Sequence, residues 1–272
     1  MSKIARVILE QSTLASSGLE LSKSSVFYVR DKVFLRLDNP GQEHITLAES
    51  AIRSGLTAGI ITTSTIKPKA LFFDMDGTVI EEESLVEISK SAGKERQIGL
   101  ITEKAMAGEL DFTESLRARL KLLEGTTKQQ VIAVRPTLCQ GISELAAWCK
   151  SLQIPFFLVS GGFIDLAKPL ANSLGFTDFR ANRFCWDGNL IRGELVEPII
   201  DAEQKKSAVI QWCKSHGIDP KNTAAIGDGA NDQMMMSTCG LAVGFRPKSI
   251  LWDKIQVANH TGDHRFLLEA FR

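Results

Sequence analysis

The first 67 residues alternate between short apolar stretches and polar or glycine-containing breaks. Residues typical of strands predict three of them, over 4–9, 26–28 and 33–37. Residues 45–54 instead predict a helix that ends at Gly55, because glycine readily adopts the left-handed conformation of helix ends. Residues 56–66 are again rich in strand-forming side chains, and 67–69 predict a linker. We therefore expect residues 1–67 to form a small α+β domain, in which no motif indicates chemistry.

From residue 70 the pattern becomes that of a larger α/β domain. Residues 70–73 are apolar throughout, which is typical of a strand buried on both faces of a parallel sheet. Residues 84–137 then show only helical periodicity, as in the apolar positions from Phe112 to Leu123. Beyond residue 138, helices (141–152, around 203–215) alternate with strands (155–160, 223–227, 241–244). This alternation predicts a doubly wound α/β core over 68–82 and 138–272, interrupted by a helical insertion over 83–137.

Polar turns containing glycine follow three of the predicted strands. They are Asp74-Met75-Asp76-Gly77-Thr78, Ser160-Gly161-Gly162 and Gly227-Asp228-Gly229-Ala230-Asn231-Asp232. Asp74 and Asp76 are two residues apart, so extended backbone places both carboxylates on one side. Reactive groups of doubly wound sheets gather at the carboxyl ends of the strands, so Asp228 and Asp232 are expected beside them. Each turn alone is more often ordinary turn chemistry, but the three together favour a catalytic site.

Such a group of carboxylates requires a compensating cation. Ionised carboxylates do not cluster in a half-buried cleft without one, and a donor set made only of oxygen suits Mg²⁺ rather than zinc. We predict that Lys206, which precedes the apolar pair Val209-Ile210, adds a second positive charge, with the adjacent Lys205 as the alternative. Ser160 and the amides that follow it would donate hydrogen bonds to the oxygens of a phosphate.

Composition narrows the class of protein further. Lys plus Arg and Asp plus Glu both number 32, so the net charge is zero, whereas nucleic-acid-binding proteins usually have a basic excess. The longest apolar stretch, 154–159, is far shorter than the ~20 residues of a membrane span, and the charged N-terminus does not resemble a signal peptide. Five cysteines without a C-x-x-C pair predict free thiols. We expect a cytoplasmic enzyme that binds a small molecule, neither nucleic acid nor membrane.

The three turns and the lysine together resemble the four motifs of the haloacid-dehalogenase superfamily. The insertion resembles that of the phosphoserine phosphatase family, in Glu83, in the segment 101–112 and in Ser115-Leu116-Arg117-Ala118-Arg119. Val159-Ser160-Gly161-Gly162-Phe163 and Ala181-Asn182 fit the same family. The resemblance extends from about residue 70 to 260 and identifies the helical insertion as a substrate-recognising cap.

The resemblance implies a Mg²⁺-dependent hydrolysis of O-phospho-L-serine to L-serine and phosphate, the last step of serine biosynthesis. Asp74 would be the nucleophile that forms an aspartyl-phosphate, and Asp76 the acid that protonates the leaving seryl oxygen and later activates water. Mg²⁺ would be held by Asp74, the backbone carbonyl of Asp76 and Asp228. The phosphoryl group would be bound by Ser160, Gly161, Lys206 and Asn231. Glu83 and Arg119 would bind the substrate's ammonium and carboxylate, and Met106 and Phe112 would line the pocket.

Other interpretations of these residues remain open from the sequence. By spacing alone, Glu83 could serve a helix N-terminus, Arg119 a solvated helix face, and Met106 and Phe112 an ordinary core. A related capped phosphatase or phosphotransferase could act on another small phosphomonoester. A receiver-like phosphate sensor would share the acidic pocket, but it would need neither an acid such as Asp76 nor a cap. Since every motif lies after Pro68, residues 1–67 are expected to be dispensable for the chemistry.

Overall fold

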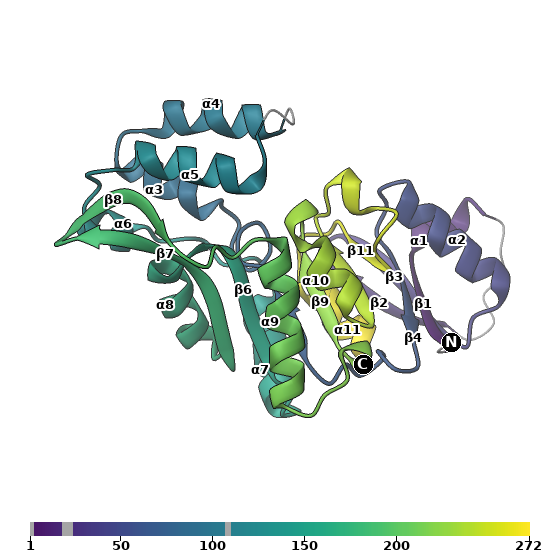
Figure 1. Cartoon of the computed structure of the whole chain (residues 1–272). Helices are drawn as coiled ribbons and strands as arrows, with labels where there is room; N and C mark the ends of the chain where they lie inside the picture. Colours follow the sequence, from purple (N-terminus) through teal and green to yellow (C-terminus); the bar gives the residue numbers. More distant parts are fainter. Residues whose placement is uncertain (1–2, 18–23, 107–109) are drawn as a thin grey trace.

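The structure, a computed structural model, describes residues 3–17, 24–106 and 110–272. Within these residues, 11 strands form one continuous sheet that runs through the whole molecule (Figure 1). Helices cover both faces of this sheet, and a group of helices stands over one end of it. None of the described helices combines the length and the apolar character that crossing a membrane requires.

The N-terminal part of the sheet is antiparallel. It comprises β1 (Ile4–Glu10), α1 (Gln11–Ala15), β2 (Ser24–Val29), β3 (Lys32–Asp38), α2 (Gln42–Arg53) and β4 (Ala58–Thr62). These elements follow the order βαββαβ, and the strands are arranged β2-β3-β1-β4, which is the ferredoxin-like arrangement. The predicted strands and helix of this segment are therefore present.

The central part of the sheet is parallel. Its strands are β5 (Leu71–Phe73), β6 (Phe156–Phe163), β7 (Asp178–Asp187), β9 (Ala224–Gly227), β10 (Leu241–Phe245) and β11 (Val257–Asn259), in the order β11-β10-β9-β5-β6-β7. One face packs against α7 (Ile142–Ser151), α8 (Ile164–Leu174) and α11 (Arg265–Phe271). The other face packs against α9 (Ala202–Ser215) and α10 (Gln233–Thr238). The predicted doubly wound α/β class is thus confirmed.

The two parts share one sheet and one core. β4 pairs antiparallel with β11, with Gly59 opposite Val257. On one face of the sheet, the rings of Phe34 and Phe266 lie 5.1 Å apart, so β3 packs directly on the C-terminal helix. Residues 1–67 are predicted as a separate domain from the sequence, because nothing in the local pattern reveals a pairing between strands as distant along the chain as β4 and β11.

The helical insertion comprises α3 (Ser84–Ser91), α4 (Glu95–Met106), α5 (Phe112–Leu122) and α6 (Lys128–Ala133). Its apolar faces form a small core of their own, which includes Leu116 and Leu120 of α5 and Ile88 of α3. The insertion is supported by a hairpin that the sequence did not predict, in which β7 continues and pairs with β8 (Leu190–Val196). The amide of Gly125, in the insertion, donates to Ile191 O of this hairpin at 2.9 Å. Helices and hairpin together stand over the end of the sheet that contains β6 (Figure 1).

Candidate active site

Three neighbouring strands bring the predicted motifs together. β9, β5 and β6 are adjacent and parallel, so their carboxyl ends meet at one edge of the sheet. Asp74 follows β5, Ser160 lies near the end of β6, and Asp228 follows β9. Asp74 and Asp228, together with Gly161 and Gly162 directly after Ser160, line a cavity of about 510 Å³ between the sheet edge and the helical cap. The size is within the usual range for a small-molecule site.

Asp74 is buried at the bottom of this site and is held in place from two sides. Its Oδ1 accepts a hydrogen bond from the backbone amide of Met75 at 2.7 Å and lies 2.7 Å from Nζ of Lys205. Burial raises the pKa of Asp74 well above its usual value, and Asp232 adds to this effect while Lys205 opposes it. The arrangement fixes one carboxylate oxygen and leaves the other for the cavity.

The lysine of the site is Lys205, and the prediction of Lys206 is wrong. The Lys205 side chain is fully buried and its Nζ contacts both Asp74 and Asp232, the latter at 2.8 Å. Burial alone would lower its pKa, but the two carboxylates raise it overall. The buried face of α9 contains Lys205, Ala208, Val209 and Trp212. Ile210, which had pointed to Lys206, is instead 46% exposed.

Asp232 is the third member of this network, on the other side of Lys205 from Asp74. Its Oδ2 accepts hydrogen bonds from the backbone amides of Asp228 at 3.1 Å and Gly229 at 3.2 Å. Carboxylate oxygens of Asp74, Asp228 and Asp232 all lie within 4.8 Å of one another. Two lysines contact these three carboxylates: Lys205, and Lys248 with its Nζ 2.9 Å from Asp228 Oδ2. One negative charge therefore remains uncompensated in an all-oxygen site, which fits a hard divalent cation.

Asp76 stands apart from that network, toward the cap. Its Oδ2 accepts a hydrogen bond from Ser84 Oγ at 2.8 Å, and its buried Oδ1 has no hydrogen-bond partner in the described structure. Burial, assisted by Glu83, raises its pKa to about 7. A carboxyl group with this pKa can both donate and accept a proton near neutral pH. The turn that follows needs glycine, because Gly77 has a φ of +66°.

Gly161 and Gly162, which follow Ser160, form another wall of the cavity. Ser160 Oγ accepts from the Gly162 amide at 2.8 Å. A Cβ on Gly161 would lie 3.0 Å from the ring of Phe112, so the absence of a side chain lets the cap approach closely. Asn182 holds this wall from behind: its Nδ2 donates to Gly161 O and its Oδ1 accepts from the Ile200 amide, both at 2.8 Å. The motif Ala181-Asn182, which had no assigned role, thus positions the turn Ser160-Gly161-Gly162.

The cap supplies the predicted residues Glu83, Phe112 and Arg119 to the same cavity. Arg119 Nε donates to Ser115 O at 3.2 Å; burial lowers the pKa of Arg119, against the opposing effect of Glu83 and Asp76. Arg117, by contrast, points outward and pairs with Glu197. Asn231 also lines the cavity. The side chain of Met106 lies outside the part of the chain that the structure describes.

Two residues that contact the acidic side chains of the site were not predicted from the sequence, and one of them, Lys248, lines the cavity. Ser84, the first residue of α3, contacts Asp76, and Lys248 contacts Asp228 with 2.9 Å between Nζ and Oδ2. The sequence offered one signal for Ser84, because it directly follows Glu83, which was predicted to belong to the site. Lys248 lies beyond β10, sixteen residues after the last motif residue, and no local pattern distinguishes it from other surface lysines.

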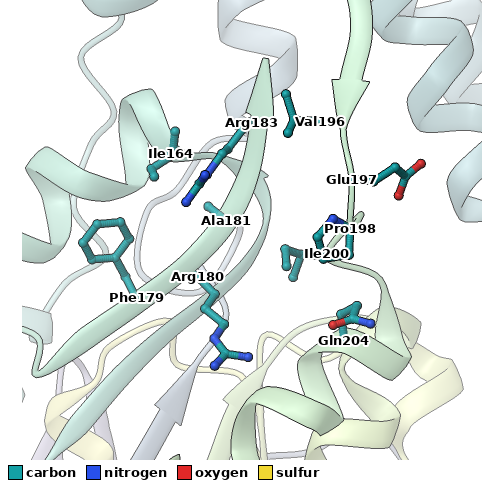
Figure 2. Close-up of a pocket in the computed structure, with 10 residues that line it drawn as sticks. All are labelled: Ile164, Phe179, Arg180, Ala181, Arg183, Val196, Glu197, Pro198, Ile200 and Gln204. Atoms are coloured by element: carbon teal, nitrogen blue, oxygen red, sulfur yellow. The ribbon is translucent and has the colours of Figure 1, made fainter. Parts of the chain in front are cut away.

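A second, smaller cavity of about 300 Å³ is lined by Ala181 and Arg183, the residues on either side of Asn182 in β7. Figure 2 shows it between β7 and the segment that follows β8, with Arg180 and Arg183 on one side and Pro198 and Ile200 on the other. It contains none of the motif carboxylates, so the first cavity is the candidate active site.

Comparison with known proteins places this site in a family. A family model described as haloacid dehalogenase-like hydrolase matches residues 68–240. A phosphoserine phosphatase of Albidiferax ferrireducens is 37% identical over 212 residues, which is 75% of this chain and 90% of that protein. A phosphoserine phosphatase of Methanocaldococcus jannaschii is 32% identical over 208 residues, which is 76% of this chain and 99% of that protein.

Solved structures agree with these relationships. A phosphoserine phosphatase with an analogue of its phospho-aspartyl intermediate superposes with a TM-score of 0.70 and 32% identity, over 76% of this chain and all of that chain. A haloacid-dehalogenase-family hydrolase from Salmonella enterica serovar Typhi superposes with a TM-score of 0.85 over 99% of this chain and 98% of that chain, at 24% identity. The second similarity shows that the fold of the whole chain, including its N-terminal strands, occurs elsewhere.

Proposed function

We propose that this chain, which belongs to the haloacid dehalogenase-like hydrolases and within them to the phosphoserine phosphatase family, hydrolyses O-phospho-L-serine to L-serine and phosphate. The observation that carries the proposal is the pairing of Asp74 with Asp76 at the bottom of a capped cavity. Asp74 is held by Lys205 and a backbone amide, while Asp76 has a pKa of about 7. One carboxylate is thus fixed for attack and the other is suited to proton transfer.

In the first step, Asp74 attacks phosphorus in line with the seryl oxygen. The bond between phosphorus and that oxygen breaks, and Asp76 gives the oxygen its proton, because an alkoxide is a poor leaving group. Lys205, together with Ser160, the Gly161 amide and Asn231, compensates the charge on the phosphoryl oxygens. L-serine leaves, and an aspartyl-phosphate remains on Asp74.

In the second step, the ionised Asp76 accepts a proton from a water molecule that attacks the same phosphorus. The bond between phosphorus and Asp74 breaks, so inorganic phosphate leaves and both carboxyl groups return to their starting states. A single residue acts as acid and then as base, which requires a pKa near the working pH. Ser84, hydrogen-bonded to Asp76 at 2.8 Å, orients this group in both steps.

A divalent cation, which we propose to be Mg²⁺, would be held by Asp74, Asp228 and the backbone carbonyl of Asp76. When bound, it offsets negative charge between the carboxylates and the phosphoryl group. The excess of carboxylates over lysine at this edge supports that assignment. Asp232, which already contacts Lys205 and two backbone amides, would position these ligands.

Substrate choice is proposed to lie in the cap. Arg119 can bind the serine carboxylate through two parallel hydrogen bonds, and Glu83 offers a negative charge to the ammonium. Both groups line the cavity that contains Asp74. A cytoplasmic location is part of this proposal, supported by five cysteines that are all free.

The test is a phosphate-release assay on the full chain, over a panel of small phosphomonoesters with Mg²⁺. We expect O-phospho-L-serine to have the highest kcat/KM, and chelation by EDTA to abolish turnover until Mg²⁺ is restored. Preference for another ester would disprove the substrate assignment while leaving the phosphatase assignment intact. Full turnover in a sample verified to be free of metal would overturn the metal assignment.

A further inference from the structure

Lys248 is a cation at the metal-binding edge that the proposed reaction does not use. Its Nζ lies 2.9 Å from Oδ2 of Asp228, one of the three clustered carboxylates. The backbone holds the pair together as well, because the Lys248 amide donates to Asp228 O at 2.9 Å. The ammonium therefore occupies one of the two carboxylate oxygens of a residue proposed to hold the metal ion.

The two lysines of the site differ in their freedom to move. Lys205 is fully buried between two carboxylates, whereas 57% of the Lys248 side chain is exposed. A lysine ammonium on a flexible, solvated stem can exchange partners at low cost, while a buried one cannot leave its carboxylates unpaired. Lys248 is thus the replaceable cation of the pair, and Lys205 the permanent one.

Lys248 also lines the substrate cavity, together with Asn231. Gly229 leaves space between them: a Cβ there would lie 3.5 Å from Lys248 Nζ and 3.0 Å from Asn231 Oδ1. Burial would lower the pKa of Lys248, but Asp228, followed by Glu83 and Asp232, raises it. The ammonium stays charged at neutral pH, between the core carboxylates and the cap.

We propose that Lys248 is the counter-cation of Asp228 in the metal-free site, that a divalent cation displaces it, and that the displaced ammonium binds a phosphoryl oxygen of the substrate. The first half depends only on the residues around Asp228, and the second half rests on the proposed phosphatase function. Two cations cannot share one carboxylate without mutual repulsion, so metal binding would turn Lys248 toward the neighbouring cavity.

The first experiment measures Mg²⁺ binding to the substrate-free full chain by isothermal titration calorimetry. In Lys248→Met the ion meets no resident cation, so we expect Mg²⁺ to bind about tenfold more tightly than to the wild type. The matched control is Lys254→Met, because this exposed lysine of the same segment contacts Gln233 and no carboxylate of the site. Unchanged or weaker Mg²⁺ binding in Lys248→Met overturns the displacement.

The second experiment measures steady-state kinetics at saturating Mg²⁺. We expect the KM of Lys248→Met to rise about tenfold for both phosphoserine and p-nitrophenyl phosphate, since the contact is to the phosphoryl group that they share. An unchanged KM for both substrates overturns the substrate contact. If the wild type does not hydrolyse phosphoserine but Lys248→Met still binds Mg²⁺ more tightly, only the proposed substrate fails. Equal thermal unfolding midpoints of the three proteins verify that folding is unaffected.

Discussion

The two ends of the active-site cavity are built differently. At the phosphoryl end, Asp74, Lys205 and Asp232 are buried and hold one another through contacts of 2.7 and 2.8 Å. At the cap end, the Arg119 side chain has a single hydrogen bond of 3.2 Å to its own helix, and the Glu83 side chain has none within the described residues. The chemistry is thus preorganised before substrate arrives, whereas the groups proposed to select the substrate are left with capacity to bind it.

The largest effect is expected from Asp74→Asn, which removes the nucleophile of the preorganised end. Turnover of every phosphate ester should fall by at least about 10⁴-fold, because no acyl-phosphate can form. Radiolabel or beryllofluoride trapping should label Asp74 in the wild type and nothing in the variant. Asp76→Asn should differ, since an activated aryl phosphate needs no proton donor and should still label Asp74 slowly. Label on another residue would contradict the assignment of the nucleophile.

The second comparison is between adjacent lysines. Lys205→Met leaves Asp74 and Asp232 buried without their cation, so we expect a loss of roughly 3–5 kcal/mol in the free energy of unfolding, together with loss of activity. Lys206→Met should change stability by less than about 0.5 kcal/mol, because its side chain is only half-buried and lies outside the cavity. Urea unfolding of both variants checks this, and equal effects would show that the network is not what holds this end together.

At the cap end, Arg119→Ala should impair one substrate selectively. Losing a charged contact to the serine carboxylate should lower kcat/KM for phosphoserine by about 30- to 1000-fold. An aryl phosphate that lacks the carboxylate should be little affected. Arg117→Ala is the matched control, because Arg117 lies two residues away but pairs with Glu197 on the outside. An equal loss for both substrates would instead make Arg119 a structural residue.

The smallest effect is expected from His264, which contacts Thr78 at the end of the turn that contains Asp74 and Asp76. His264 is fully buried, and its Nε2 contacts Thr78 O at 2.8 Å; burial lowers its pKa to about 4. The unfolded chain, with a histidine pKa near 6.5, binds more protons below that pH, so stability falls as pH drops from 6.5 toward 4. This group alone should cost about 2 kcal/mol at pH 5. Urea unfolding of wild type and His264→Gln at pH 5 and 8 should show a smaller pH dependence in the variant.

The preorganised end could be predicted from sequence because each of its parts has a local signature. An apolar run such as 71–73 predicts a buried strand, and the polar turn after it must lie at the sheet edge. The prediction of Lys206 was wrong because it used only the apolar pair Val209-Ile210, whereas five residues from Lys205 to Cys213 define the buried face of α9. The pairing of β4 with β11, the hairpin of β7 and β8, and the contact of Lys248 with Asp228 depend on long-range packing, which local periodicity does not encode.

The same structure changes what we expect of residues 1–67. Every motif residue does lie beyond them, but Phe34 packs on Phe266 and β4 covers β11. A chain starting near Ile66 would expose this apolar surface and an open strand edge, which favours aggregation. We therefore expect its loss to cost solubility and stability first, whatever remains of the chemistry.

The junction of β4 and β11 also has a consequence for synthesis on the ribosome. The residues of β1 to β4 are synthesised near the beginning of translation, and the pairings among these strands involve only the first 62 residues. Their partner strand, however, begins only at Val257. For most of elongation the hydrogen-bonding edge of β4 therefore has no partner strand, because β11 is the last strand to be synthesised. An unpaired strand edge of this kind can pair with other chains, and completion of β11 covers it.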